Sequence, residues 1–412
     1  MRDKLILLAS AFTVFACAPG TSGVTETGDI MNSSTQLQLE ISKLETDIQN
    51  GEFGFIDEVV LHHNDEAVFH YKAMRNYLEV AKAAGMVPQT STEPVSFSYI
   101  EGTELHTLQS ITKTVTAMLI GILETEGKIP NVSEAKVADI LEDKFDIPYR
   151  DENWDALTVE HLLTMRDNLD WDEDGVYINN ANDATKIAEA SDPGQFVLNK
   201  AMKGPPGENA EWRYNGGASH LLGVIIQTVT GQTAAEYAQA KLFQPMNIQS
   251  FHWDTESEQS NQSSTQGGLH LQASDLIKFC HLLKKDGSWQ GKKLISSGYI
   301  NRVSRYTTRF ASTFELPGTE SGWFWQNGYG YQVWLGDKTF SSEKAVVGAG
   351  YGGQYLTCVP EKDIDVLIFS SNFEDAFSSK DLYAELGGMG FKEAGWKLRQ
   401  RINSQILPLL DQ

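Results

Sequence analysis

Hydrophobic and polar positions alternate near both ends of the chain, which predicts strands in both places. Residues 53–74 hold two β-rich runs separated by Asn64 and Asp65, a pattern typical of a β-hairpin with a tight turn. After residue 328, four further runs predict strands, and an amphipathic helix follows in GWKLRQRINSQILPLL. The four runs are YGYQVWLG, KAVVGAG, GGQYLTCVP and DIDVLIFSSN.

The middle of the chain shows the period of helices instead. A helix is predicted from Thr107 to Glu126, with Gly127 as its stop signal, and helical patterns dominate as far as about residue 285. The run DTESEQSNQSSTQGG at 254–268 contains no apolar anchor, which predicts a surface loop.

Strands at both ends around a helical middle predict an α/β (α+β) architecture with two lobes. We expect an α/β lobe formed by residues of about 51–128 and 286–412. An all-α lobe at about 129–285 is then inserted into it.

The first residues have the features of an export signal. Arg2 and Lys4 precede LILLASAFTVFA, an apolar run that is too short to span a membrane as a helix, and Cys17 follows. The letters VFAC resemble a lipoprotein cleavage box. We therefore expect residues 1–17 to form a signal peptide with a lipobox-like end and residues 18–50 to form a flexible tether and a leading helix. The mature protein would lie in the periplasm or cell envelope, with a lipid on Cys17 as its membrane anchor.

Charge and cysteine content narrow the choice of partners. The formal net charge of −22 argues against a nucleic-acid partner, whose phosphates would be repelled. No C-x-x-C motif is present, so a zinc ribbon is excluded. Cys280 and Cys358 each lie in an apolar segment, and we expect two separate core thiols rather than a disulfide.

Three glycines reproduce the spacing of a dinucleotide-binding motif. Gly348, Gly350 and Gly353 read G-x-G-x-x-G, but such a site needs a helix after the glycines, and here the β-rich run QYLTCVP follows. The run DWDEDG similarly begins like a calcium loop, yet Ala181 stands where a bidentate Glu is required. The sequence therefore predicts neither a nucleotide cofactor nor a metal.

The motif S-x-x-K offers a nucleophile. Serine and lysine three residues apart share one helix face, so a neutral amine can take the serine proton. The motif occurs at Ser110, Ser133 and Ser341, and the last two lie in polar surroundings where a lysine stays hydrated. Ser110 instead opens the apolar helix SITKTVTAMLIGILETEG, where burial of Lys113 favours the neutral amine. We therefore expect Ser110 and Lys113 to be the reactive pair.

A proton relay is expected close to this pair. Tyr214 stands at the entrance of a second apolar helix, in EWRYNGGASHLLGVIIQTVTG. A phenol at such a place can pass protons between the serine and a leaving group.

The order of these segments resembles the serine β-lactamase and penicillin-recognising enzyme superfamily. The similarity is greater to its esterase-like branch, which is related to class C β-lactamases and aminohexanoate-oligomer hydrolases. It covers about Phe53 to Asn372 and rests on several segments in the right order. These segments are SITK, HLLTMRDNLDWDEDG, RYNGGASHLLGVIIQTVTG, GGLHLQASDLIKFCHLLKKDG, YGYQVW and GAGYGGQYLTCVP.

The resemblance implies an antiparallel sheet flanked by helices and a role for each candidate residue. Ser110 would be the acylated nucleophile, with Lys113 as its base partner and Tyr214 as the tyrosine of the Y-x-N motif. The main-chain N–H groups of Ser110 and Tyr351 would form the oxyanion hole, and Gly350 would be the turn residue beside the bound substrate.

The sequence departs from the family pattern at two places. Gly216 replaces the asparagine of Y-x-N, and Gly348-Ala349-Gly350 stands where a lysine or histidine precedes the strand. An anionic β-lactam carboxylate needs a cation at the second place, so its absence weighs against β-lactam substrates.

The leading hypothesis is an exported serine hydrolase that cleaves small esters or amides without a cofactor. A β-lactamase or D-alanyl-D-alanine carboxypeptidase is the alternative with the same chemistry. A catalytically silent cell-envelope binding protein is the alternative from another class, and an NAD-dependent oxidoreductase is the least favoured.

Overall fold

An antiparallel sheet lies at the centre of the fold. The computed structural model describes residues 33–73, 76–173, 182–310, 326–374, 377 and 379–410. Among these residues the sheet has eight strands in the order β2-β1-β13-β12-β11-β10-β9-β8. The strands are β1 (Ile56–His63), β2 (Glu66–Lys72), β8 (Thr308–Arg309), β9 (Gly328–Tyr329), β10 (Trp334–Asp337), β11 (Ser342–Gly350), β12 (Gln354–Val359) and β13 (Ile364–Ser370).

The predicted hairpin is confirmed as β1 and β2. Asn64 and Asp65 have φ angles of 55° and 60°, which the two central residues of a tight type I′ turn require. Strand β1 also pairs with β13, so the two ends of the chain meet within one sheet.

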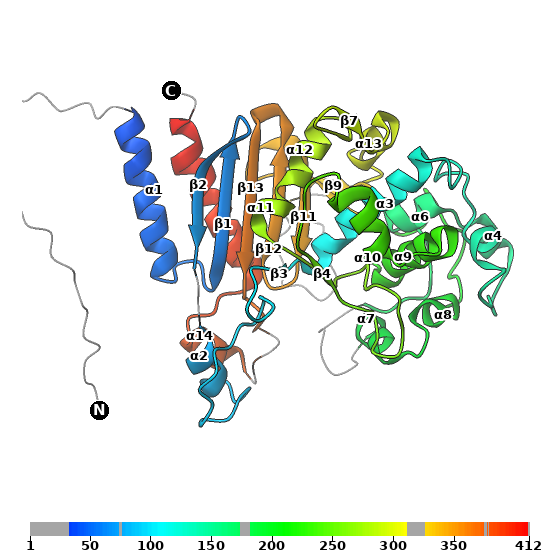
Figure 1. Cartoon of the computed structure of the whole chain (residues 1–412), viewed down its shortest axis with the longest axis horizontal. Helices are drawn as coiled ribbons and strands as arrows, with labels where there is room; N and C mark the ends of the chain where they lie inside the picture. The colour runs from blue at the N-terminus through cyan, green and yellow to red at the C-terminus, as the bar shows by residue number, and fades with distance from the viewer. Residues whose placement is uncertain are drawn as a thin grey trace, which may run out of the picture.

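Alternating side chains give the sheet two apolar faces. In β1, Val59 and Leu61 pack on one face with α1 (Ser33–Gln49) and α15 (Phe391–Arg401). Val60 points to the other face, toward helix α3 (Thr112–Thr125). Figure 1 shows α1 on one side of the sheet and the helices around α3 on the other. The predicted antiparallel sheet flanked by helices is thus confirmed.

The helical part of the molecule is built around α3 and α9 (Gly216–Thr230), which pack against each other. Both are buried over most of their length because their residues are apolar on nearly all sides. The surrounding helices are α4 (Val137–Leu141), α5 (Glu152–Ala156), α6 (Val159–Thr164), α7 (Asp183–Lys186), α8 (Pro193–Leu198) and α10 (Ala234–Ala238).

Short elements complete the described chain. A three-stranded sheet joins segments that are far apart in the sequence, in the order β3-β5-β4. Its strands are β3 (His106–Thr107), β4 (His252–Trp253) and β5 (Leu269–Leu271). The remaining α-helices and strands of the described residues are α2 (Leu78–Ala83), α11 (Ala273–Leu276), α12 (Lys278–Lys284), β6 (Ser288–Trp289), β7 (Lys292–Lys293), α13 (Ser297–Val303) and α14 (Lys380–Glu385).

The expectation of two separate thiols was wrong. Cys280 in α12 and Cys358 in β12 form a disulfide, with their Cα atoms 5.3 Å apart. Each cysteine lies in an apolar segment as expected, but helix α12 packs against the sheet face that carries Cys358. The bond therefore depends on how a helix docks on a sheet, which the apolar context of either residue does not reveal.

The expectation of a surface loop at 254–268 was also wrong for much of that segment. Gln262 and Thr265 are buried, although neither is apolar. The Thr265 hydroxyl donates to the main-chain oxygen of Ser219 at 3.0 Å, and the Gln262 side-chain oxygen accepts from the N–H of Gly194 at 2.8 Å. Polar side chains can be buried when they are hydrogen-bonded, so a lack of apolar residues did not imply exposure.

The predictions for the first residues fall mainly outside the described chain. The signal peptide and Cys17 lie in residues 1–32, which the structure does not describe. Within the described part, no helix combines the length and the apolar character needed to cross a membrane.

Candidate active site

Ser110 lies in the short helical turn η1 (Gln109–Ile111), which runs directly into α3. The turn begins after an unusual backbone conformation, since Gln109 has a φ of 49° in the left-handed region. Two hydrogen bonds hold it there: the main-chain and side-chain nitrogens of Gln109 both donate to the Thr107 hydroxyl. Ser110 is thereby left half-buried at the start of a buried helix.

Lys113 lies one turn further along the same helix, only 3% exposed. Its Nζ donates to the Ser110 Oγ at 3.2 Å and to the main-chain oxygen of Gln266 at 2.7 Å. The spacing of S-x-x-K on a helix therefore does bring the amine to the hydroxyl.

The other two S-x-x-K motifs are arranged differently in the described chain. The Ser133 hydroxyl donates to the Asn131 side chain, and the Lys136 amine donates to the main-chain oxygen of Ala156. Ser341 and Lys344 are both exposed at the solvent surface. The surroundings of these two lysines are polar or solvated, as the sequence predicted.

Tyr214 lies two residues before α9, and its ring contacts two groups. The Lys113 Nζ is 4.9 Å from the centre of the ring, and the ring also stacks on Trp334 with centroids 5.8 Å apart and planes 7° from parallel. The next residue, Asn215, caps α9 by accepting from the N–H of Ala218 at 2.9 Å. The structure thus brings together the three side chains that the sequence predicted, namely Ser110, Lys113 and Tyr214.

Strand β11 passes very close to the turn that carries Ser110. A Cβ atom at Gly350 would lie 2.5 Å from the main-chain oxygen of Leu108, and one at Gly348 would lie 3.1 Å from the Ile111 side chain. Glycine is needed at position 350 for this approach, and at position 348 any larger residue would crowd the Ile111 side chain. The glycines join β11 to β12, which agrees with the rejection of a dinucleotide site.

Tyr351 lies in the turn between β11 and β12, which the N–H of Gly353 closes by donating to the Gly350 oxygen at 3.2 Å. The buried side chain of Gln354 supports this turn, since its Nε2 donates to the Tyr351 oxygen at 3.1 Å. The oxyanion role of the Tyr351 N–H and the substrate-binding role of Gly350 stay predictions.

At Gly216, where the family motif has an asparagine, two other side chains fill the space that the asparagine would occupy. A Cβ atom at this position would lie 2.1 Å from the Gln266 Oε1 and 3.0 Å from the Glu173 Oε2. Glu173 also accepts the N–H of Gly216. Our sequence reasoning missed Gln266 and Glu173, and the only signal that could have pointed to them was the glycine itself.

The buried carboxyl of Asp167 is hydrogen-bonded to Asn215, the residue after Tyr214. Burial raises the pKa of the Asp167 carboxyl to about 6, because desolvation penalises its charged form. Hydrogen bonds from the Leu169 N–H and the Asn215 Nδ2 to Oδ1 act in the opposite direction. Oδ2 has no hydrogen-bond partner among the described residues.

The pKa of Asp167 predicts a pH dependence of stability. The folded protein binds the Asp167 proton more tightly than the unfolded chain does, because the pKa of this carboxyl is about 6 when folded and 3.8 when unfolded. The resulting stabilisation is therefore present below pH 3.8 and is lost as the pH rises through about 6. Between pH 4 and pH 7, we expect the wild type to lose about 2 kcal/mol of unfolding free energy relative to Asp167→Asn. Urea unfolding at several pH values measures the difference.

The matched control is Asp170→Asn, which changes an exposed carboxyl three residues away. It should leave the pH profile of the wild type unchanged. Parallel profiles for the wild type and Asp167→Asn would contradict the prediction.

The potential metal ligands in the described chain do not form a usable centre. Cys280, Cys358 and Asp365 place ligand atoms within 4.8 Å of one another. The two sulfur atoms are bonded to each other, however, so neither is a thiolate that could bind a metal.

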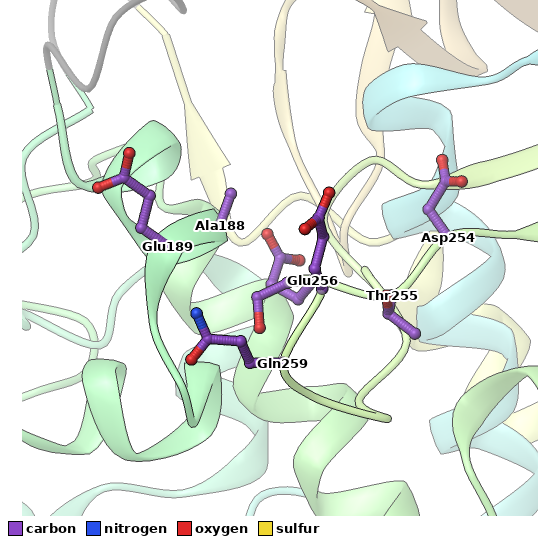
Figure 2. A pocket seen from close by; sticks show the side chains of 8 residues that line it. Ala188, Glu189, Asp254, Thr255, Glu256 and Gln259 are labelled. Atoms are coloured by element: carbon purple, nitrogen blue, oxygen red, sulfur yellow. The ribbon is translucent and has the colours of Figure 1, made fainter.

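A cavity of about 770 Å³ is lined by Ala188, Glu189 and residues 254–259. Figure 2 shows Ala188 and Glu189 on one side of it and the 254–259 segment on the other. Its lining includes neither Ser110 nor Lys113.

Comparisons with known proteins find relatives of this chain. Over 279 residues the chain is 24% identical to the 6-aminohexanoate-dimer hydrolase of Paenarthrobacter ureafaciens, and the match covers 65% of this chain and 66% of that one. Over 166 residues it is 30% identical to a penicillin-binding protein of Bacillus subtilis (strain 168), covering 37% of this chain and 33% of that one. The chain thus spans less than two thirds of the length of either relative.

The fold has counterparts among solved structures. A penicillin-binding protein homologue from Caulobacter crescentus superposes with a TM-score of 0.61 at 15% identity, covering 93% of this chain and 99% of that one. The family model described as Beta-lactamase matches residues 59–387, a range that includes every candidate catalytic residue. By this match over most of its length, the chain belongs to the beta-lactamase family.

Proposed function

We propose that this protein is a serine hydrolase that cleaves small esters or amides through an acyl-enzyme on Ser110. The observation that carries the proposal is the contact between the buried Lys113 amine and the Ser110 hydroxyl at 3.2 Å. A buried lysine beside a half-buried serine is the arrangement that nucleophilic catalysis needs. The similarity to a relative named as an aminohexanoate-dimer hydrolase supports the same class of reaction.

The first step would acylate the serine. The Ser110 Oγ attacks the substrate carbonyl carbon while its proton passes to the Lys113–Tyr214 pair. The N–H groups of Ser110 and Tyr351 would hold the negative oxygen of the tetrahedral intermediate. When the intermediate collapses, the bond to the leaving alcohol or amine breaks and that group receives the proton.

The second step would release the acid. A water molecule loses a proton to the same pair and attacks the acyl carbon. The bond to the Ser110 Oγ then breaks, and the serine regains its proton. Lys113 and Tyr214 would therefore serve both half-reactions.

A β-lactamase or D-alanyl-D-alanine carboxypeptidase is the second candidate, and the similarity to a penicillin-binding protein favours it. The close packing of β11 against the turn that carries Ser110 weighs against a β-lactam substrate. A Cβ atom at Gly350 would lie 2.5 Å from the Leu108 oxygen, and one at Gly348 would lie 3.1 Å from the Ile111 side chain, so a long cationic side chain at either position would crowd the turn that carries Ser110. Without such a cation the β-lactam carboxylate lacks its partner.

Covalent labelling tests the proposal. The purified protein is treated with a fluorophosphonate, digested and analysed by mass spectrometry, and p-nitrophenyl acetate hydrolysis is measured in parallel. We expect one adduct, on the peptide that contains Ser110, and a loss of hydrolysis in proportion to labelling. If the adduct formed on another serine, and the loss of hydrolysis were proportional to the labelling of that serine, the proposal would be contradicted.

The same preparation separates the alternatives. Nitrocefin turnover, or a stable adduct with a fluorescent penicillin, would favour the β-lactam candidate. A protein that is neither labelled nor able to hydrolyse any of these compounds would instead be a silent binding protein.

A further inference from the structure

The main-chain oxygen of Gln266 is one of the two hydrogen-bond partners that fix the Lys113 amine. The residues that follow it are Gly267 and Gly268, which restrict the backbone less than any other residues. The N–H groups of Gly267 and Gly268 donate to the Ser264 oxygen at 3.4 and 3.0 Å. The 3.4 Å contact of the Gln266–Gly267 peptide is long, so the hold on the Gln266 side chain is a second constraint on the orientation of the Gln266 carbonyl group.

Glu256 holds that side chain. The Gln266 Nε2 donates to the Glu256 Oε1, and Glu256 is itself only 6% exposed. Figure 2 shows that Glu256 comes from the loop segment that borders the cavity. A buried carboxylate needs partners for both oxygens, and Gln266 satisfies only one.

His220 faces the second oxygen, with its Nδ1 3.3 Å from the Glu256 Oε2. The neighbouring Gln262 fixes the proton on the other ring nitrogen. Its Nε2 donates to the carboxylate of Asp192, so its Oε1 must be the acceptor for the N–H of Gly194 and for the His220 Nε2. The His220 Nε2 thus carries a hydrogen.

The hydrogen on Nε2 bears on whether a proton also lies between the His220 Nδ1 and the Glu256 Oε2. A neutral ring with its hydrogen on Nε2 would turn a bare Nδ1 toward a carboxylate oxygen, and the two lone pairs would repel each other. The two atoms are 3.3 Å apart but are not aligned as a hydrogen bond, and a proton shared between Nδ1 and Oε2 would remove the repulsion. His220 thus lies against one oxygen of Glu256, while the other oxygen accepts from Gln266.

The Gln266 side chain also fills the place of the missing motif asparagine. Its Oε1 would lie 2.1 Å from a Cβ atom at Gly216, so an asparagine and this glutamine could not both occupy the space. The glycine at 216 and the glutamine at 266 are thus two parts of one arrangement beside Lys113.

We propose that Glu256 is a positioning residue for Lys113, which acts by fixing Gln266 in the space that the motif asparagine would otherwise fill. The inference rests on the proposed function, in which Lys113 takes the Ser110 proton. It adds to the site a buried carboxylate that never touches the substrate.

Two substitutions at one position test the inference. Glu256→Ala removes the partner of Gln266, and we expect it to lower kcat for p-nitrophenyl acetate by about 10- to 100-fold with little change in KM. In Glu256→Gln, the new carboxamide oxygen can accept from Gln266 and its nitrogen can donate to the His220 Nδ1. This variant should therefore stay within about threefold of the wild-type kcat, because the hydrogen bonds are kept although the charge is gone.

The matched control is Ser257→Ala, a buried neighbour whose hydroxyl has no hydrogen-bond partner among the described residues. It should leave kcat unchanged. If Glu256→Ala keeps full kcat, if Glu256→Gln is as slow as Glu256→Ala, or if Ser257→Ala is equally slow, the inference is wrong.

A second measurement does not depend on activity. Competitive acetylation followed by mass spectrometry gives the reactivity of Lys113 relative to Lys284, another little-exposed lysine. In Glu256→Ala, we expect Lys113 to react several times faster than in the wild type, whereas in Glu256→Gln it should react at the wild-type rate. An unchanged rate in Glu256→Ala would overturn the inference even if the wild type proved to have no hydrolase activity.

Discussion

Replacement of Ser110 by alanine is expected to lower kcat/KM for p-nitrophenyl acetate by at least about 10³-fold, because the acyl group then has no oxygen to which it can bond. Lys113 and Tyr214 would remain in place, so the expected loss comes from the nucleophile alone. Thermal unfolding of the variant should be close to that of the wild type, since Ser110 is half-buried and alanine is tolerated in the first turn of a helix.

The chain supplies a matched control for this prediction. Ser133→Ala changes another serine of an S-x-x-K motif, whose lysine donates to the main chain of Ala156. It should retain full activity. If the Ser110 variant hydrolyses the ester as fast as the wild type, or if the Ser133 variant loses activity to the same extent, Ser110 is not the nucleophile.

Removal of the Cys280–Cys358 bond is expected to destabilise the protein by about 4 kcal/mol. The bond closes a loop of 78 residues, and the chain entropy that the unfolded state regains without it corresponds to roughly this value. It also joins helix α12 to strand β12, next to the ion pairs that Lys284 makes with Asp65, Asp363 and Asp365. Loss of the bond should therefore loosen α12 first.

Urea unfolding of Cys280→Ala/Cys358→Ala measures the effect. The wild type in excess dithiothreitol should approach the stability of this double variant, and the double variant itself should not respond to the reductant. A wild type whose stability is the same in oxidising and reducing buffers would show that the bond contributes little.

The contact between Ser110 and Lys113 could be predicted from the sequence because it is local. Ser110 and Lys113 are three residues apart on one helix, and helix geometry alone brings them to the same face. The apolar residues around them predicted burial, and this is what separated them from the motif at Ser133. Tyr214 needed the resemblance to a family, since no local rule connects it with Ser110.

The groups that hold this pair could not be predicted in the same way. Gln266 is 153 residues from Lys113 in the sequence, and it lies in a polar run that we expected to be a surface loop. Glu256 and His220 also have no shared pattern, and they meet only because the loop packs against α9. The assignment of Cys17 and the export signal stays a prediction.

By itself the sequence determined the strands, the buried helices and the contact between Ser110 and Lys113, because periodicity and i,i+3 spacing act over a few residues. It also showed that glycines join two strands near residue 350. Only the tertiary structure decided that Cys280 reaches Cys358, that the 254–268 segment is largely buried, and that Gln266 occupies the space beside Gly216. These are contacts between segments far apart in the chain, and they depend on how closely whole elements pack, which no local pattern encodes.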